Sequence, residues 1–469
     1  MTLTEPSRPV LRAPLLDGPP VAIIGAGPVG LAAAAHLLER GIDFRIYETG
    51  ASAASSVAAW AHVRLFSPWS FLIDPAARRL LGTTDWAAPD ADRLPTGAEL
   101  IDCYLGPLAA HDAIAERTHT GSTVVSVSRQ GMDRTRSTDR ATTPFVLRIR
   151  TGVKLEEVTA SAVIDASGTY ASPSGLSSNG LEPLGADEVS DRVVHALPDV
   201  LGADRARFTG RHTTVVGAGH SAANTLIALA QLAREEPGTR VSWVIRTTAA
   251  ARVSASPDDE LQARASIGAQ VAALVADREI TLVDRFEIER LRPSGVADAA
   301  AAGTAVGAVH REGAGETLRR GVVLVGRRRG EPFEIVTDII VGATGFRPDL
   351  SMLREIRLDL DEIVEAPRRL APLIDPNLHS CGTVEPHGFA ELQHPEPGFF
   401  IAGMKSYGRA PTFLLSTGYE QVRSIAAWLA GDLAAARAVQ LVLPATGVCS
   451  TGDAGAAVGM DEVGGGCCA

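Results

Sequence analysis

The sequence predicts an α/β fold with two similar parallel-sheet domains, and three observations lead to this expectation. Two β-branched runs, at 21–24 and 213–216, each end in a glycine-rich turn that is followed by a helical segment. A further apolar run follows each helical segment, so strand, helix and strand alternate as in a βαβ unit. The chain has 469 residues, which is too long for one ordinary hydrophobic core.

The first turn, Gly25-Ala26-Gly27-Pro28-Val29-Gly30, has the spacing of a dinucleotide-binding turn. Gly25 allows the tight turn, Gly27 lets the backbone approach a pyrophosphate, and Gly30 lets the helix pack on the strand. The run at 42–47 ends in Glu48, where a carboxylate can accept both hydrogen bonds of a ribose diol. Strand, turn, helix and terminal acid agree, which argues against a chance cluster of glycines. A site this close to the N-terminus is typical of FAD.

The second turn repeats the pattern with Gly217, Gly219 and Ser221, and Ala222 replaces the third glycine. The strand expected at 241–245 ends in Arg246 and Thr247, and a cation at this place can pair with a 2′-phosphate. We therefore expect NADPH here, although an exposed arginine without a ligand remains the alternative. Two such units in one chain indicate electron transfer between a nicotinamide and a flavin.

The segments between the two turns predict how the domains are organised. A helix is expected at 96–110, and antiparallel strands are expected at 122–127 and 145–150. Two similar segments, Val163–Gly168 and Ile339–Gly345, flank the second unit, which indicates two Rossmann-like dinucleotide-binding domains with the NADPH domain inserted in the FAD domain. The expected divisions are a flexible leader at 1–20, an FAD domain at 21–175 and 336–440, an NADPH domain at 176–335, and a flexible Gly/Cys tail at 441–469.

Composition excludes several classes of protein. The net charge of −11 opposes binding to a phosphate backbone, so a nucleic-acid partner is not expected. The apolar runs are too short to cross a membrane, and five scattered cysteines do not resemble a disulfide framework. We expect a cytoplasmic protein that acts on a small-molecule substrate, and the sequence leaves a homodimer open.

From Val21 to Gly431 the chain resembles the two-dinucleotide-binding-domain flavoproteins, and within them the flavin-containing monooxygenases, including the flavin-binding monooxygenases of bacterial arsenic-resistance clusters. Besides the two turns, the stretches 60–69, 343–348 and 398–403 carry the resemblance. It implies that a helix beginning at Ser416–Tyr419 faces the flavin pyrimidine and stabilises the reduced flavin. The monooxygenase fingerprint before the second turn is not intact, because no Phe-x-Gly precedes His195.

The resemblance completes the set of residues expected to bind the cofactors. The set is Gly25, Gly27, Pro28, Gly30, Glu48, Trp60, Arg64, Val124, Ala166, Gly168, Gly217, Gly219, Ser221, Arg246, Thr247, Thr344, Gly345, Gly403 and Thr417. Lys405, Tyr407 and Arg409 either line the flavin pocket or form a solvent-facing loop. No catalytic side chain and no structural metal site is predicted.

The chain ends in Cys467 and Cys468, which resemble the vicinal cysteine pair of mercuric reductases and are candidate ligands of a thiophilic ion. An unselected tail is the alternative. The expected reaction is hydride transfer from NADPH to FAD, followed by oxygenation of a soft sulfur, nitrogen or arsenic atom. Two other functions stay open: a reductase that passes electrons through the cysteine pair, and a redox or metalloid-binding protein without turnover.

Overall fold

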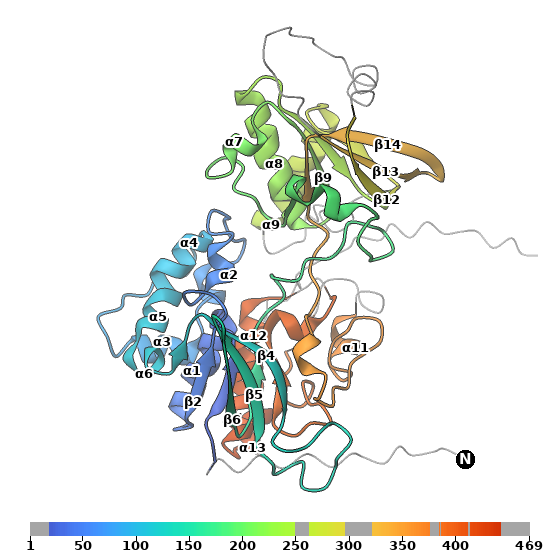
Figure 1. Ribbon diagram of the computed structural model, residues 1–469. Coiled ribbons are helices and arrows are strands. Elements are labelled where there is room, and N and C mark those ends of the chain that lie inside the picture. Colours follow the sequence, from blue (N-terminus) through green and yellow to red (C-terminus); the bar gives the residue numbers. More distant parts are fainter. Residues whose placement is uncertain are drawn as a thin grey trace, which may run out of the picture.

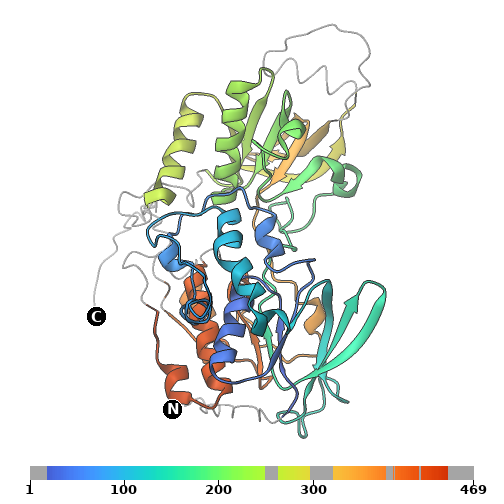
Figure 2. The ribbon, with the colours of Figure 1, turned by 90° about the vertical axis from the view of Figure 1, so that its left-hand side faces the viewer.

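Two parallel five-stranded sheets form the centres of two bodies, which lie one above the other in Figures 1 and 2. The computed structural model describes residues 18–248, 262–295, 321–375, 384, 386–410 and 413–441. The expected tail after its first residue, including Cys467 and Cys468, lies outside these residues, as does nearly all of the expected leader. The expected α/β class and its two Rossmann-like sheets are confirmed.

The first sheet has the strand order β16-β7-β1-β2-β3, and all of its neighbouring strands are parallel. Its strands are β1 (Val21–Ile24), β2 (Phe44–Tyr47), β3 (Thr118–His119), β7 (Val163–Asp165) and β16 (Phe399–Ile401). Side chains alternate along β1. Val21 and Ile23 pack against helices, whereas Ala22 and Ile24 pack against a separate antiparallel layer of β4 (Ser122–Arg129), β5 (Phe145–Thr151) and β6 (Lys154–Ala160).

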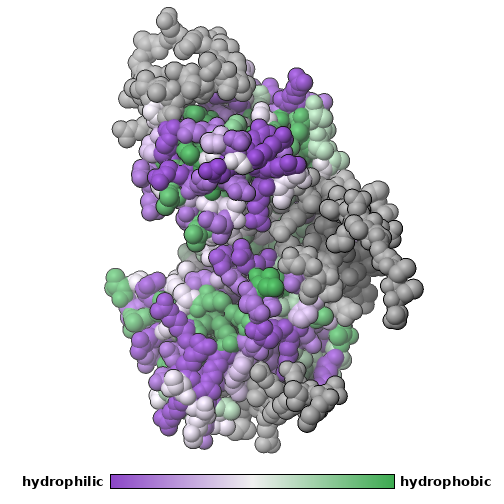
Figure 3. All heavy atoms as spheres, turned by 90° about the vertical axis from the view of Figure 1, so that its right-hand side faces the viewer, coloured by the Kyte–Doolittle hydropathy of each residue, from purple (hydrophilic) through white to green (hydrophobic). Residues whose placement is uncertain are grey.

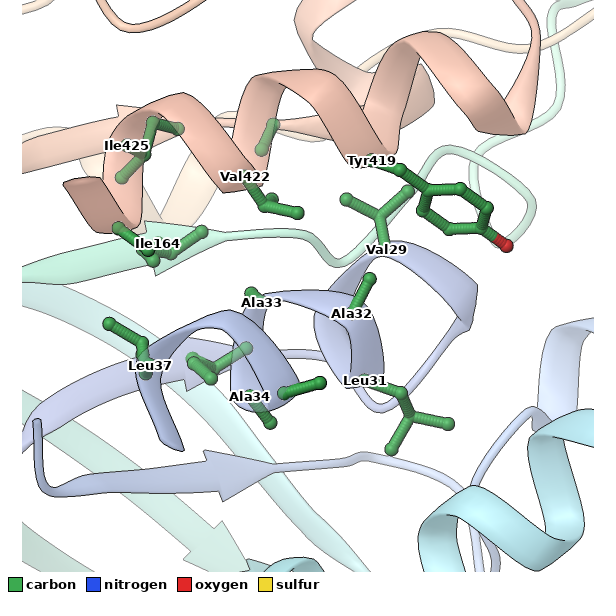
Figure 4. Close-up of a cluster of buried hydrophobic side chains, with 14 of the residues drawn as sticks. Val29, Leu31, Ala32, Ala33, Ala34, Leu37, Ile164, Tyr419, Val422 and Ile425 are labelled. Carbon is green, nitrogen blue, oxygen red and sulfur yellow. The ribbon is translucent and has the colours of Figure 1, made fainter. Parts of the chain in front are cut away.

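Helices α1 (Pro28–Glu39) and α12 (Leu415–Leu429) pack against each other on the helical face of this sheet. Four consecutive alanines of α1, at 32–35, are buried, and Ala32 and Ala33 lie on the side that faces Val422 and Ile425 of α12, where their small side chains let the helices come close (Figure 4). The remaining helices of the first body are α2 (Ser55–Ala58), α3 (Pro75–Leu81), α4 (Gly97–Leu100), α5 (Gly106–Ala110), α6 (Asp112–Ala115), α11 (Ala371–Ile374) and α13 (Leu433–Arg437).

The second sheet repeats this design with the order β11-β10-β9-β15-β8. Its strands are β8 (Val193–His195), β9 (His212–Val216), β10 (Arg240–Val244), β11 (Thr281–Val283) and β15 (Ile339–Gly342). Helices α8 (His220–Glu235) and α9 (Gln262–Ala276) pack on one face, and the antiparallel strands β12 (Phe286–Pro293), β13 (Val322–Arg328) and β14 (Glu331–Thr337) cover the other. The short helix α7 (Arg205–Phe208) precedes β9.

One expected boundary is wrong. We expected the second FAD segment to begin at residue 336, but β15 pairs in parallel with both β9 and β8 and therefore belongs to the second sheet. The likeness of Val163–Gly168 to Ile339–Gly345 has a simple reason, because β7 lies beside β1 as β15 lies beside β9. The chain returns to the first body only after this strand.

The two segments that cross between the bodies are hydrogen-bonded to each other. Ser174 donates its N–H to the carbonyl of Gly345 over 2.8 Å, and Arg347 donates its N–H to the carbonyl of Ser172 over 2.9 Å. The rings of Tyr170 and Phe346 stack with their centroids 5.3 Å apart. The crossing is therefore a short antiparallel ribbon rather than two separate linkers.

The expected helix at 96–110 is present but is not regular. Thr96 and Glu99 form a capping box before α4, and a π-helical turn at Ile101–Leu105 joins α4 to α5. The strands expected at 122–127 and 145–150 correspond to β4 and β5, whereas β6 and the whole β12–β14 layer were not expected.

Most of the surface seen in Figure 3 is hydrophilic, and the larger apolar patch lies on the first body. Within the described ranges, no helix combines the length and the apolar character that a membrane crossing requires.

A buried ion cluster ties the antiparallel layer to the first sheet. The carboxylate of Glu396, which precedes β16, accepts hydrogen bonds from Arg129 over 2.7 Å and from Arg140 over 2.8 Å, and its side chain is fully buried. The Arg129 guanidinium also lies over the ring of Phe145, 3.6 Å from its centroid. Removal of the carboxylate would leave two buried cations without their counter-charge.

We expect Glu396→Gln to lower the free energy of unfolding by about 3–5 kcal/mol, because breaking a buried ion pair leaves an uncompensated charge. Urea unfolding measures the change. Glu157→Gln is the control, since Glu157 pairs with Arg148 on the surface and its loss should cost under about 1 kcal/mol. Equal effects of the two substitutions would contradict this account of the cluster.

Candidate functional site: two dinucleotide-binding turns

Steric contacts fix the first turn at the carboxyl edge of the first sheet. Gly25 has a φ of +96°, and a Cβ added there would lie 2.9 Å from the carbonyl oxygen of Ala166. A Cβ on Gly30 would lie 2.0 Å from the carbonyl oxygen of Gly25. Both positions therefore require glycine for the fold itself, and the turn lies against the segment Ala166–Gly168.

Gly27 differs from its two neighbours, because a Cβ added there would have no atom within 4 Å. Its backbone, with φ −77° and ψ −175°, suits any residue. Pro28 occupies the start of α1, and no side chain of the described residues caps this helix start. An open approach to uncapped N–H groups is what a pyrophosphate needs, so the turn fits a dinucleotide.

Glu48 lies beside this turn with its carboxylate oriented by backbone groups. It accepts hydrogen bonds from the N–H of Ala26 and from the N–H of Gly50, each over 2.7 Å. The side chain follows β2 and stays partly exposed. This position beside the first turn suits an acceptor for a ribose diol.

Val29 connects three segments of the expected flavin site. Cβ atoms added to Gly403 and Gly418 would lie 3.1 Å and 2.7 Å from Val29, so the loop after β16 and the first turn of α12 both pack against the first glycine-rich turn. Figure 4 shows Val29 beside Tyr419 of α12. Thr417 is buried in the same helical turn and contacts Tyr407. Burial raises the pKa of the Tyr407 hydroxyl, and the contact with Thr417 lowers it by a smaller amount.

The second turn is held by equivalent contacts. Gly217 has a φ of +138°, and its added Cβ would lie 2.1 Å from the carbonyl oxygen of Ala343 at the end of β15. The indole N–H of Trp243 donates to the Gly217 carbonyl over 2.7 Å, a contact that the sequence analysis missed. A Cβ on Gly219 would have no atom within 4 Å, so this position is as open as Gly27.

Residues after the second turn lie near the place that the sequence predicts for them. Ser221 is in the first turn of α8, while Arg246 and Thr247 follow β10 and are exposed. One Arg246 N–H donates to the Ser178 carbonyl over 3.3 Å, which is long for a hydrogen bond. The ring of Phe66 in the first body lies 5.8 Å from the ring of His220 in α8, so the two bodies meet beside the second turn.

Five other expected cofactor residues have structural contacts elsewhere, and their role in binding stays a prediction. Trp60 packs on Gly97, and Arg64 donates to the Leu94 carbonyl over 2.7 Å. Val124 is buried between the sheet and the antiparallel layer. Thr344 and Gly345 are in the crossing ribbon, where the Thr344 hydroxyl donates to the Ser174 carbonyl over 2.7 Å.

The loop after Gly403 is not the simple solvent-facing loop that one interpretation predicts. Lys405 and Tyr407 are 2% and 1% exposed, and only Arg409 is on the surface. The Lys405 ammonium donates to Asp165 over 2.7 Å and to the Ser167 hydroxyl over 3.1 Å. Neither Asp165 nor Ser167 was expected in the site, because no pattern in the sequence links residues 240 positions apart.

Within the described part of the chain, Cys103 is the only cysteine, and it packs on the helical core of the first body. The indole of Trp86 donates to its carbonyl over 2.7 Å. No three His, Cys, Asp or Glu side chains of the described residues gather as a metal site would require.

Comparison with known proteins identifies the family. The family of pyridine nucleotide-disulphide oxidoreductases matches residues 22–308, more than half of the chain, so the chain belongs to this family. A search of curated protein sequences found no match. The chain is accordingly an FAD- and NAD(P)H-dependent oxidoreductase, as expected.

Solved structures with the same fold include both disulfide reductases and monooxygenases. The bacillithiol disulfide reductase from Bacillus cereus has a TM-score of 0.60 and 19% identity, over 88% of this chain and 99% of that one. The FAD-bound cadaverine monooxygenase from Erwinia amylovora has a TM-score of 0.55 and 14% identity, over 91% of this chain and 98% of that one. The ornithine N-hydroxylase from Kutzneria sp. 744 was solved with reduced FAD and NADP+. It has a TM-score of 0.53 and 15% identity, over 88% of this chain and 98% of that one. At sequence identities this low, the comparisons show that the fold is shared and nothing more.

We expect Gly27→Ala to leave the apoprotein as stable as the wild type, because its methyl group meets no protein atom, and to weaken FAD binding at least about tenfold. Thermal melting of the apoprotein and fluorescence titration with FAD measure the two effects. Gly30→Ala is the matched comparison, since its methyl group collides with Gly25 and should destabilise the apoprotein itself. Tight FAD binding by a stable Gly27→Ala variant would show that the pyrophosphate does not lie on this turn.

Proposed function

We propose that the chain is an FAD-dependent, NADPH-consuming monooxygenase that oxygenates a soft heteroatom, sulfur, nitrogen or arsenic, of a small substrate. One observation supports the use of two nucleotides. At the edge of each sheet, a glycine-rich turn packs tightly against the neighbouring strand but has one glycine with free space beside it, Gly27 in the first body and Gly219 in the second. FAD held at the first turn would supply the transfer of electrons from NADPH to oxygen, so that one oxygen atom would enter the substrate and the other would leave as water. The protein contributes orientation and the exclusion of water.

The residues of the first body suit FAD. The N-terminus of α1 offers uncapped N–H groups to the pyrophosphate, and Glu48 offers a carboxylate to the adenosine ribose. The turn at Ala166–Gly168 and the loop at Gly403 lie against the first turn. The N-terminus of α12 lies beside Val29, and its dipole would stabilise negative charge on a reduced ring.

The residues of the second body suit NADPH rather than NADH. Arg246 follows the strand next to the glycine turn, which is where the 2′-position of an adenosine ribose lies in such domains. Its guanidinium is exposed and makes one long hydrogen bond, so it is available to a 2′-phosphate.

Reduction of a disulfide is the second candidate function. A flavoprotein disulfide reductase needs a thiol that the flavin can reach, and the one described cysteine, Cys103, packs in the helical core. The shared fold with bacillithiol disulfide reductase supports the alternative of a reductase, which would use Cys467 and Cys468 outside the described residues. A protein that binds both nucleotides without turnover is the third possibility.

A turnover experiment separates these functions. We expect NADPH oxidation by the purified chain to require oxygen and to rise when a small thioether, amine or arsenite substrate is present, with formation of the oxygenated product. Oxygen uptake and mass spectrometry of the product measure this. Anaerobic NADPH oxidation with a small disulfide, lost in Cys467→Ser/Cys468→Ser, would replace the proposal by the reductase, and bound cofactors with no turnover would leave only binding.

We expect Arg246→Ala to raise the KM for NADPH about tenfold, which corresponds to about 1.4 kcal/mol, because one charged contact to the 2′-phosphate is lost. The KM for NADH should not change. Steady-state kinetics with both nucleotides measure the effect. Arg240→Ala is the control, since Arg240 is exposed at the opposite end of the same strand, β10. An equal effect on NADH and NADPH would show that Arg246 does not read the phosphate.

A further inference from the structure

A lysine is buried at the carboxyl edge of the first sheet, where the proposed flavin site lies. Lys405 is 2% exposed and Asp165 is fully buried, and their charged groups are 2.7 Å apart. Only two of the 44 basic residues of the chain are lysines, and the other, Lys154, lies on the surface. A compact ammonium thus occupies one interior position in a chain whose basic residues are almost all arginine.

This ion pair is hydrogen-bonded to the turn at Ala166–Gly168. Asp165 ends β7, and its second carboxylate oxygen accepts hydrogen bonds from the Ser167 N–H over 3.2 Å and from the Ser167 hydroxyl over 2.6 Å. Lys405 donates to the same hydroxyl over 3.1 Å. Ser167 itself is exposed, and Gly168 has a φ of +70° with open space where a Cβ would lie. The buried pair thus holds a turn whose Ala166 carbonyl lies against Gly25, whose Ser167 is exposed and whose Gly168 has open space beside it.

The loop that carries Lys405 is fixed to α12 by a second set of buried hydrogen bonds. Gln421 of α12 accepts from the Gly403 N–H over 2.8 Å and donates to the Ser406 hydroxyl over 3.0 Å. The Gln421 amide nitrogen also lies 2.9 Å from the His387 ring nitrogen. Through Lys405, the turn after β7, the loop after β16 and the helix α12 form one connected polar unit.

We propose that Lys405, paired with Asp165, is a positioning residue for the flavin, which sets the turn at Ala166–Gly168 and the loop at Gly403 in register with each other. This inference rests on the proposed FAD site and adds to it two residues that the glycine motifs do not include. A pair that served only stability could be replaced by apolar residues at little cost, because desolvation offsets most of the attraction in a buried ion pair. Its place at the binding edge of the sheet, under an open turn, argues for positioning.

The experiment compares Lys405→Met, the neutral double variant Asp165→Asn/Lys405→Met, and Lys154→Met as a surface lysine control. The double variant removes both charges together, so it avoids the unpaired carboxylate that can unfold the single variant. Each full-length apoprotein is melted without FAD, titrated with FAD by fluorescence, and examined by visible circular dichroism when loaded.

We expect the double variant to melt close to the wild-type apoprotein, to bind FAD at least about tenfold more weakly, and to change the visible dichroism of the bound flavin. Lys154→Met should match the wild type in all three measurements. Wild-type FAD affinity and dichroism in the double variant would overturn the inference. So would a loss of FAD affinity that the loss of apoprotein stability fully accounts for, because that result assigns a structural role.

Failure of the proposed function has a different signature. A wild-type chain that takes up no FAD would overturn the FAD site, and the inference with it, before any variant is compared. Normal FAD uptake by the wild type and by the double variant alike would remove only the role of Lys405.

Discussion

Both bodies depend on one steric constraint: the first glycine of each turn lies against a carbonyl group at the end of the neighbouring strand. Gly25 meets Ala166 in the first body, and Gly217 meets Ala343 in the second. A side chain at either glycine would push the turn away from the sheet edge and tilt the helix that begins there. Because the contact is the same in both bodies, α1 and α8 start in equivalent positions. Each helix N-terminus therefore points beyond the carboxyl edge of its own sheet.

Polar interactions in the first body divide into two kinds by position. At the amino-terminal end of β16, Glu396 with Arg129 and Arg140 joins the antiparallel layer to the sheet, at the opposite end of the strand from the glycine-rich turn. At the carboxyl end of the same strand, Lys405 and Asp165 underlie an exposed turn. The two clusters are equally buried, but only the second lies where parallel α/β sheets bind ligands.

The sequence alone could predict the parts of the fold that local patterns encode. Glycine spacing located both turns, and the β-branched runs around them located β1 and β9, because these signals lie within ten residues of each other. The start of α12 was predicted from the resemblance to flavin-containing monooxygenases. The order of strands in the sheets was harder, and Ile339–Gly342 was placed in the wrong body because an isolated apolar strand carries no mark of its partners.

Site residues that depend on distant contacts could not be predicted in this way. The Trp243 indole, in the next strand, donates to the Gly217 carbonyl, and Asp165 meets Lys405, which lies 240 positions further along the chain. A lysine after a buried strand is compatible with a surface loop until its partner is known. Burial decides between the two interpretations, and burial is a property of the whole fold.

The antiparallel ribbon between the bodies limits how they can move relative to each other. Two strands joined by hydrogen bonds resist bending within the plane of the ribbon, since one strand would have to lengthen while the other shortens. They flex more readily perpendicular to that plane, so any reorientation of the upper body becomes a swing about one preferred axis. A single linker would permit twisting in every direction, whereas this pairing, with Tyr170 stacked on Phe346, would restrain the joint and favour bending about one axis.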